Sequence, residues 1–161
     1  RLAFFPEQCR HCIMARRLLG ADKPDAIFQD QATGAVVFTE KTQGLNTRPV
    51  IAVCPYDVPR RSPSGVLAKC DLCNERVKQG LEPACVQTCP TGCLNFGTLK
   101  DVRQMAFERL ERVKHAFPEA RLLDADQVRV IFLTAHAPNQ YHARASSFDP
   151  ALWQPRKSPV H

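Results

Sequence analysis

Eight cysteines among 161 residues constrain this chain more than any other feature. They are too sparse for a disulfide scaffold, which typically contains roughly 8–10% cysteine, and a chain of this length can bury a core of its own. Two C-x-x-C pairs begin at Cys9 and at Cys70, and both Cys54 and Cys89 are followed directly by proline. Such spacing favours thiolate ligands of an inorganic group over structural cross-links.

The densest group of cysteines has the pattern C-x2-C-x11-C-x3-C-P and consists of Cys70, Cys73, Cys85 and Cys89. Bacterial ferredoxins use C-x2-C-x2-C-x3-C-P, in which three cysteines hold one [4Fe–4S] cluster and the fourth reaches a second cluster. A tight loop lets the first two sulfurs face one cluster, and proline, with its fixed φ, turns the chain away after the last cysteine. The group therefore predicts iron–sulfur ligation.

The longer second gap, residues 74–84, is interpreted as an insertion that still leaves its ends beside one cluster. Its stretch from Glu75 to Gly80 predicts a short helix ended by glycine. The alternative for the whole group is a zinc ribbon or knuckle, which also uses C-x-x-C pairs. Zinc sites usually pair two such knuckles, whereas the second half of this group is C-x3-C-P.

A second group consists of Cys9, Cys12 and the distant Cys54. Three cysteines do not complete a four-ligand site, and taken alone they are also compatible with zinc or a redox-active C-x-x-C. Beside the first group, they predict a second cluster.

The remaining sequence indicates an α+β fold with ferredoxin-like cluster lobes. Residues 26–40 predict a β-hairpin turning at Thr33-Gly34, and the Pro-, Arg- and Ser-rich residues 41–65 predict a loop. An amphipathic helix is expected over 99–117, capped by Thr98 and stopped by Pro118.

Residues 128–134 are apolar and largely β-branched, which predicts a strand. Three regions follow from this reading. Residues 1–97 form a cluster-binding region, 98–134 a helix–strand extension, and 135–161 an extended tail that contacts a partner subunit.

The formal net charge of +6 allows a rival class, a zinc-stapled module that binds nucleic acid through a basic surface. Charge does not decide the matter, because cluster-bound thiolates and sulfides would offset part of the positive excess. No apolar run approaches the roughly 18–20 residues that span a bilayer. The chain begins at Arg1 without a signal-like segment, and we expect it to be an N-terminally incomplete fragment.

Six stretches in order resemble a known family. They are Cys9-Arg-His-Cys12, Thr33-Gly-Ala-Val36, Ala52-Val-Cys-Pro-Tyr-Asp-Val-Pro59, Lys69-Cys-Asp-Leu-Cys73, Gly80-Leu-Glu-Pro-Ala-Cys85 and Cys89-Pro-Thr-Gly92. Together they resemble the iron–sulfur (beta) subunits of molybdopterin oxidoreductases of the dimethyl-sulfoxide-reductase superfamily, of the four-cluster-ferredoxin type. The similarity is greatest to tungsten- or molybdenum-dependent formate dehydrogenases, and the stretch from Val128 to His136 extends it.

The resemblance implies [4Fe–4S] clusters, three in an intact subunit, and a large catalytic partner that carries the pterin metal. It assigns Cys70, Cys73 and Cys85 to one cluster, whose fourth cysteine lies in an N-terminal motif that this chain lacks. Cys89 would reach the cluster held by the rest of that motif. The third cluster would use Cys9, Cys12 and Cys54.

Arg17 stands where the family pattern places a further cysteine. Because arginine offers no ligand, the third site is expected to hold a [3Fe–4S] cluster, to use another fourth ligand, or to be empty. Cys93 replaces a usual alanine and is either a stand-in ligand or a small buried apolar side chain. His11 lies inside the family motif and is expected beside the ligands rather than among them.

The expected function is electron conduction without a catalytic residue of its own. Electrons from formate oxidation would leave the catalytic subunit, pass through the clusters and reach an acceptor such as a cytochrome or ferredoxin. Charges beside the ligands, at Lys69, Arg76 and Arg10, would either raise the reduction potentials or be plain surface charge. The same role in a thiosulfate, polysulfide or nitrate reductase stays open. Export with the catalytic subunit would place the chain in the periplasm, with the cytoplasm as the alternative.

Overall fold

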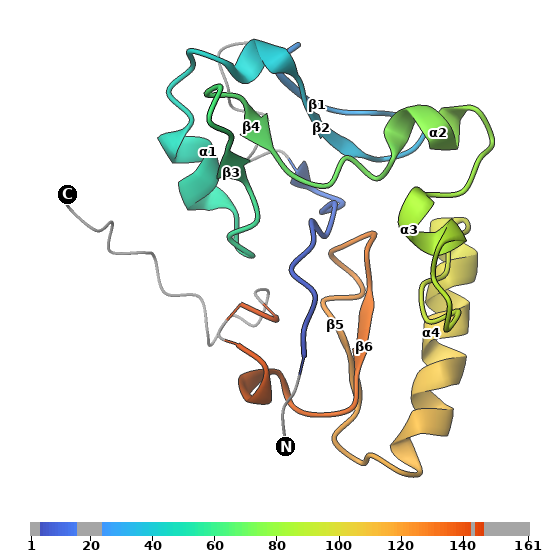
Figure 1. Ribbon diagram of the computed structural model, residues 1–161. Coiled ribbons are helices and arrows are strands. Elements are labelled where there is room, and N and C mark those ends of the chain that lie inside the picture. Colours follow the sequence, from blue (N-terminus) through green and yellow to red (C-terminus); the bar gives the residue numbers. More distant parts are fainter. Residues whose placement is uncertain (1–3, 16–23, 143, 147–161) are drawn as a thin grey trace.

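The computed structural model describes residues 4–15, 24–142 and 144–146. Within these residues the chain forms three two-stranded antiparallel sheets and four α-helices (Figure 1), which confirms the α+β class. The strands are β1 (Ile27–Gln29), β2 (Val36–Phe38), β3 (Arg60–Arg61), β4 (Leu67–Ala68), β5 (Arg121–Leu123) and β6 (Phe132–Thr134). The helices are α1 (Arg48–Val53), α2 (Asn74–Lys78), α3 (Ala84–Gln87) and α4 (Leu99–Lys114), with 3-10 turns at Glu40–Thr42 and Pro138–Gln140.

The hairpin predicted over 26–40 is confirmed. Strands β1 and β2 pair antiparallel, with Phe28 opposite Val37. The Asp30 carboxylate accepts the amide protons of Ala32 and Thr33 and so closes the turn. Gly34 has a φ of +72°, and an added Cβ would lie 2.0 Å from Nε of Arg129. Glycine is therefore required here by conformation and by close approach.

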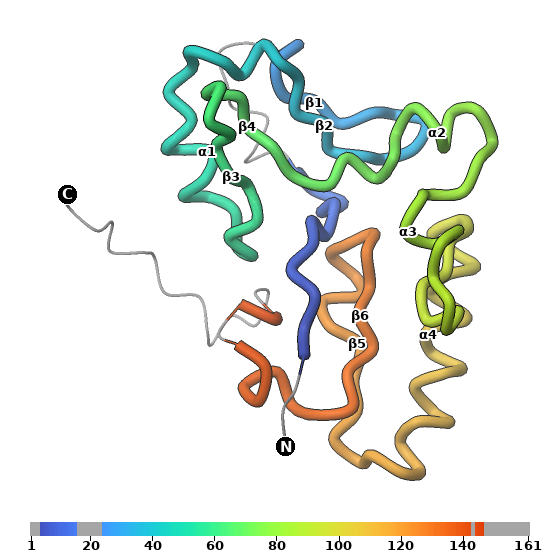
Figure 2. Tube along the Cα trace, in the orientation of Figure 1, coloured from blue at the N-terminus to red at the C-terminus, as the bar shows by residue number. Residues whose placement is uncertain are grey.

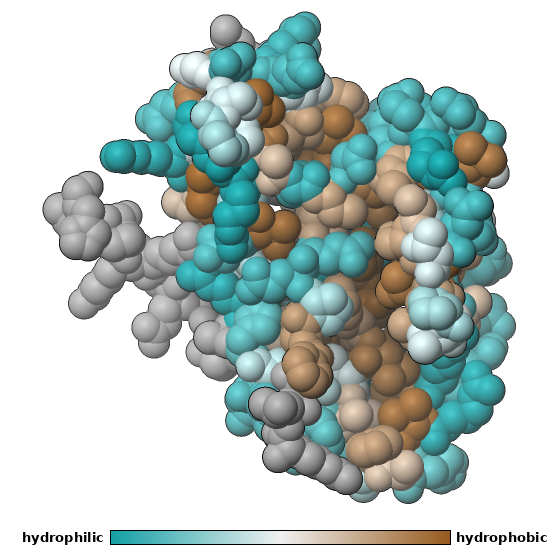
Figure 3. Space-filling view, in the orientation of Figure 1, coloured by the Kyte–Doolittle hydropathy of each residue, from teal (hydrophilic) through white to brown (hydrophobic). Residues whose placement is uncertain are grey.

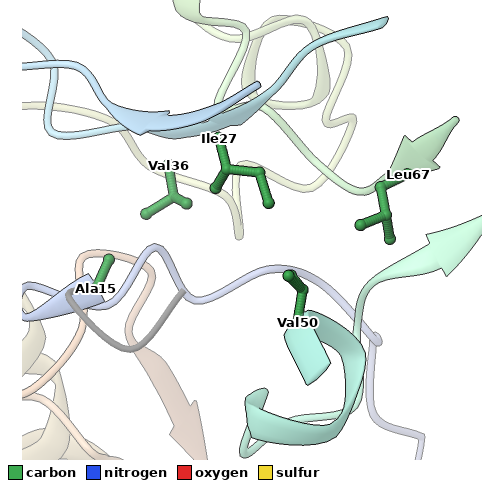
Figure 4. Packing of buried hydrophobic residues seen from close by; sticks show 5 residues of the cluster. All are labelled: Ala15, Ile27, Val36, Val50 and Leu67. Carbon is green, nitrogen blue, oxygen red and sulfur yellow. The ribbon is translucent and has the colours of Figure 1, made fainter. Parts of the chain in front are cut away.

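The prediction of a loop over 41–65 is wrong in part, because helix α1 and strand β3 form within it. The helix accommodates Pro49 in its first turn, where the missing amide proton would have had no intrahelical partner. Val50 from α1 then joins Ile27, Val36, Ala15 and Leu67 in a buried apolar cluster (Figure 4). This cluster holds the first hairpin, α1 and the β3–β4 hairpin together.

Helix α4 begins where the sequence predicts and ends at Lys114, before Phe117 and Pro118. The Thr98 hydroxyl accepts the amide proton of Asp101, as the capping pattern predicts. The short helix predicted at 75–80 is confirmed as α2.

Only the end of the strand predicted at 128–134 is strand, namely β6. Its partner β5 was not predicted. Val128 instead forms an isolated bridge with Cys12, and the main chain of Arg10 accepts hydrogen bonds from Arg129 and Val130. The first C-x-x-C loop therefore lies against the segment that precedes β6 (Figure 2).

Among the described residues, no helix combines the length and apolar character needed to cross a bilayer. The predicted tail from Ala135 is described only to residue 146, with a gap at 143. The tail residues beyond it and Arg17 lie outside the described residues.

Candidate iron–sulfur sites

A cavity of about 270 Å³ lies where the second C-x-x-C loop faces α4 and the segment leading into β6. Three of the four cysteines of the dense group, Cys70, Cys73 and Cys85, line it together with Cys93. Much of the rest of the wall is apolar and includes Met105 of α4 and Ile131, Phe132 and Val130. Apolar side chains, coloured brown in Figure 3, gather in a hollow on this face of the molecule.

Cys89 is not part of that wall. Its Sγ lies 3.5 Å from Sγ of Cys93, at the turn that follows α3. The amide of Leu94 and the hydroxyl of Thr91 lower the pKa of Cys89 to about 6. Cys93 is exposed as well as cavity-lining, so the interpretation of Cys93 as a buried apolar side chain is wrong.

The two C-x-x-C loops share one local geometry. In the first, the amide of His11 donates to Sγ of Cys9 at 3.5 Å, and in the second the amide of Leu72 donates to Sγ of Cys70 at 3.4 Å. His11 and Leu72 both have left-handed φ angles, 45° and 63°. The left-handed turn aims an amide at the preceding sulfur, which stabilises a thiolate.

The first group of cysteines is enclosed within the protein. Cys9 and Cys54 are buried and Cys12 is partly buried, and Cys12 and Cys54 meet in an apolar cluster with Tyr56 and Val128. Burial, then the neighbouring thiols of Cys9 and Cys54, raises the pKa of Cys12 to about 12. The three sulfurs are thus near enough to influence each other electrostatically.

Arg10 is not a surface charge. Its guanidinium lies 3.8 Å from the ring centroid of Phe132 and 5.0 Å from that of Tyr56, and Nη2 donates to the Ala145 carbonyl. Burial lowers its pKa to about 10. Arg10 therefore anchors the first loop against the C-terminal segment.

His11 and Lys69 lie between the two loops. His11 is fully buried, and its Nδ1 accepts the amide proton of Val36 at 3.0 Å. Burial, then Lys69 and Arg129, lowers the pKa of His11 to about 3, so the ring is neutral. Lys69 Nζ donates to the carbonyl oxygens of Val36 and Cys70. His11 thus lies close to both C-x-x-C loops, and its place beside cluster ligands stays a prediction.

No group of three or more His, Cys, Asp or Glu side chains in the described part of the chain is spaced to hold a single metal ion.

A family model described as a 4Fe-4S dicluster domain matches residues 1–99. The chain belongs to this family. It is also 53% identical over 146 residues to formate dehydrogenase subunit beta of Megalodesulfovibrio gigas, a match that covers 88% of this chain and 68% of the relative. These matches confirm the predicted resemblance to formate dehydrogenase beta subunits and a ferredoxin-like dicluster region.

Further relatives have the same kind of name. Formate dehydrogenase 2 subunit beta (cytochrome c-553) of Nitratidesulfovibrio vulgaris is 41% identical over 148 residues, covering 88% of this chain and 68% of the relative. Formate dehydrogenase-O iron-sulfur subunit of Escherichia coli is 36% identical over 162 residues, covering 91% of this chain and 53% of the relative.

The residues of the dicluster domain fit its [4Fe–4S] cofactors. Thiolates are the ligands that these clusters take, and Cys70, Cys73 and Cys85 lie on one cavity with apolar walls. The amide of Leu72 already donates to one of those sulfurs, which is the outer interaction that tunes such centres. The family match and this donor set identify [4Fe–4S] clusters as the cofactors.

Sequence reasoning missed the part played by Val36. The Val36 amide donates to His11 of the first C-x-x-C loop, and the Val36 carbonyl accepts from Lys69, which precedes the second. Main-chain groups have no sequence signature, and only the hairpin register brings Val36 to this place.

Proposed function

We propose that this chain is the electron-relay subunit of a formate dehydrogenase. Its [4Fe–4S] clusters would accept and donate single electrons between a catalytic subunit with a tungsten or molybdenum pterin and an external acceptor. The observation that carries the proposal is the apolar cavity lined by Cys70, Cys73 and Cys85. Formate is proposed as the substrate of the catalytic partner because the relatives are named as formate dehydrogenase beta or iron-sulfur subunits.

The proposed ligands of one cluster are Cys70, Cys73 and Cys85, and those of another are Cys9, Cys12 and Cys54. Cys89, which is not among the residues that line the cavity, would serve a neighbouring cluster, in keeping with its proline and its low thiol pKa. With Arg17 in place of a cysteine, the first group would hold a [3Fe–4S] cluster, use a fourth ligand other than cysteine, or hold no cluster. Cys12 is largely buried, and the neighbouring Cys9 and Cys54 raise its pKa, which supports a common site for the three cysteines.

Cys93 is proposed as an additional ligand of the cluster in the cavity, because it is the fourth cysteine on that wall. The substitution Cys93→Ala tests this proposal. If Cys93 is a ligand, its removal should convert the cluster to a three-iron form with its own electron paramagnetic resonance signal. An unchanged spectrum with unchanged iron content would reject Cys93 as a ligand.

The protein's own residues have three tasks in this proposal. The left-handed loops present the amides of His11 and Leu72 to sulfurs. The apolar walls, such as Phe132 and Met105, limit water around the centre. Burial and hydrogen bonds set the energy of adding an electron, because each additional negative charge must be stabilised by the surroundings.

A cytochrome or ferredoxin is proposed as the acceptor, and one relative has cytochrome c-553 in its name. The tail from Ala135 would contact the catalytic subunit. Location in the periplasm, by export together with the catalytic subunit, is likewise a proposal.

Metal analysis of the anaerobically purified complex with its catalytic partner tests the proposed function. We expect iron and acid-labile sulfide in equal amounts, broad absorption near roughly 400 nm, and no stoichiometric zinc. Zinc without sulfide, in a colourless preparation that binds nucleic acid with steep salt dependence, would instead support the zinc-stapled module.

A further inference from the structure

Lys69 occupies a position that ligand spacing does not explain. It precedes Cys70, yet its side chain extends to β2, where Nζ donates to the Val36 carbonyl, and it also donates to the Cys70 carbonyl at 3.0 Å. His11, from the other C-x-x-C loop, accepts from the amide of the same Val36. The ammonium group is therefore held between the two cysteine sites.

The surroundings of this ammonium are largely apolar or uncharged. Nζ lies 4.6 Å from the ring centroid of Phe38, donates to two carbonyl oxygens, and also has the Cys9 side chain within its reach. Within the described residues no carboxylate forms an ion pair with it. Burial lowers the pKa of Lys69, and the groups whose anionic forms would oppose that shift are Cys9, Cys70 and, on the exposed surface, Asp71. Burial raises the pKa of both thiols, so they become anionic only as ligands.

A purely structural role would not require the charge. Two carbonyl acceptors can be satisfied by a neutral donor, whereas an enclosed ammonium has a desolvation cost that an opposite charge must offset. The groups placed to do so are the sulfurs of Cys9 and Cys70, one from each C-x-x-C loop, in their thiolate form. Both become anionic when they bind iron.

We propose that Lys69 is a shared interior charge that raises the reduction potentials of both cysteine sites. The inference rests on the proposed electron-relay function. Reduction adds negative charge to a centre, and a nearby enclosed cation stabilises that charge more strongly than a screened surface cation does. One side chain thereby keeps both centres reducible by the same donor.

The test is Lys69→Met in the complex with the catalytic partner, followed by redox titration monitored by electron paramagnetic resonance. We expect both midpoint potentials to fall, each by about a tenfold change in the one-electron equilibrium, or about 59 mV. Lys69→Arg keeps the charge and should keep both potentials near the wild-type values. The matched control is Lys114→Met, which removes the same charge from the exposed end of α4.

The dependence of the potential shifts on salt concentration distinguishes an interior charge from a surface charge. The shifts caused by Lys69→Met should persist at about 0.5 M salt, where exposed charges are largely screened. Unchanged potentials in Lys69→Met, or shifts equal to those of Lys114→Met, would overturn the inference and leave the proposed function intact. Absence of iron–sulfur signals in the wild-type complex would overturn the proposed function itself.

Lys69→Gln covers the case in which Lys69→Met does not assemble, because the amide still donates to the carbonyl of Val36 or Cys70. Lower potentials in Lys69→Gln would support the inference. Failure of both neutral variants to bind clusters, while Lys69→Arg binds them with altered potentials, would show a role in assembly and overturn the inference.

Discussion

The two C-x-x-C loops have the same turn but different surroundings. In each, a left-handed residue donates its amide to the first sulfur of the pair. The first loop is enclosed with Cys54 and Tyr56, and burial raises the pKa of Cys12 to about 12. The second opens onto a cavity and continues to Cys89, whose thiol pKa is lowered to about 6 by the Leu94 amide. Local sequence thus specifies the turn, and the hairpin and the β5–β6 segment specify its environment.

Cysteine substitutions should separate the two loops most strongly. Cys73→Ser should remove up to about four iron atoms and the signal of the cavity site, because a serine hydroxyl is a poor substitute for a thiolate ligand. Cys12→Ser should instead abolish the signal of the enclosed site and leave that of the cavity site. Iron determination and electron paramagnetic resonance on both complexes check this. Loss of both signals in each folded variant would mean one shared site rather than two.

Gly34→Ala should destabilise the protein and disturb the enclosed site in particular. The left-handed backbone costs a non-glycine residue roughly 1–2 kcal/mol, and the new Cβ would displace the Arg129 guanidinium, which donates to the Cys12 carbonyl. Gly44→Ala is the matched control, since Gly44 also has a positive φ but nothing within 4 Å. In thermal unfolding, the melting temperature should fall further for Gly34→Ala than for Gly44→Ala. Equal decreases in melting temperature would exclude a role for the Arg129 contact.

Asp30→Asn should have the smallest effect and act on the cavity side. Its carboxylate pairs with Nζ of Lys78 on α2 at 2.6 Å, and Lys78, then the Thr33 amide, lowers the pKa of Asp30. A lowered pKa contributes stability above the ordinary aspartate pKa of about 3.9, and that contribution is lost as the pH falls below it. The melting temperature of the variant should be a few degrees lower at pH 7, with a difference that stays nearly as large at about pH 4 and shrinks toward about pH 2.

The control for this ion pair is Glu111→Gln, which breaks an exposed pair with Lys114. It should leave the melting temperature unchanged, because such surface pairs contribute little. An equal effect of the two substitutions would mean that Asp30 does not secure α2 to the hairpin turn.

Much of the fold follows from local rules. The hairpin at β1–β2 has a glycine turn, α4 has a Thr98 cap, and α2 follows directly from its sequence. The sequence does not predict helix α1, because Pro49 and the surrounding arginines and prolines are typical of a loop. The sequence predicts only β6 of the C-terminal sheet. Strand β5 is short and forms through its pairing with β6.

The sequence predicts which cysteines of the dense group lie together, whereas their role as ligands stays a prediction. Spacing brings Cys70, Cys73 and Cys85 together, and the structure places all three on one cavity. Spacing could not show that Cys93 shares that wall or that Lys69 extends to Val36. Both placements depend on how distant segments pack, and packing of that kind leaves no periodic pattern in the sequence.

The most direct test of electron relay is to add formate to the oxidised, anaerobic complex and freeze it within a single turnover. Electron paramagnetic resonance signals of reduced clusters from this chain should appear at the rate of formate oxidation, and Cys73→Ser should remove the signal of the cavity site. Formate turnover with an artificial acceptor while every cluster of this chain stays oxidised would contradict electron relay through this chain.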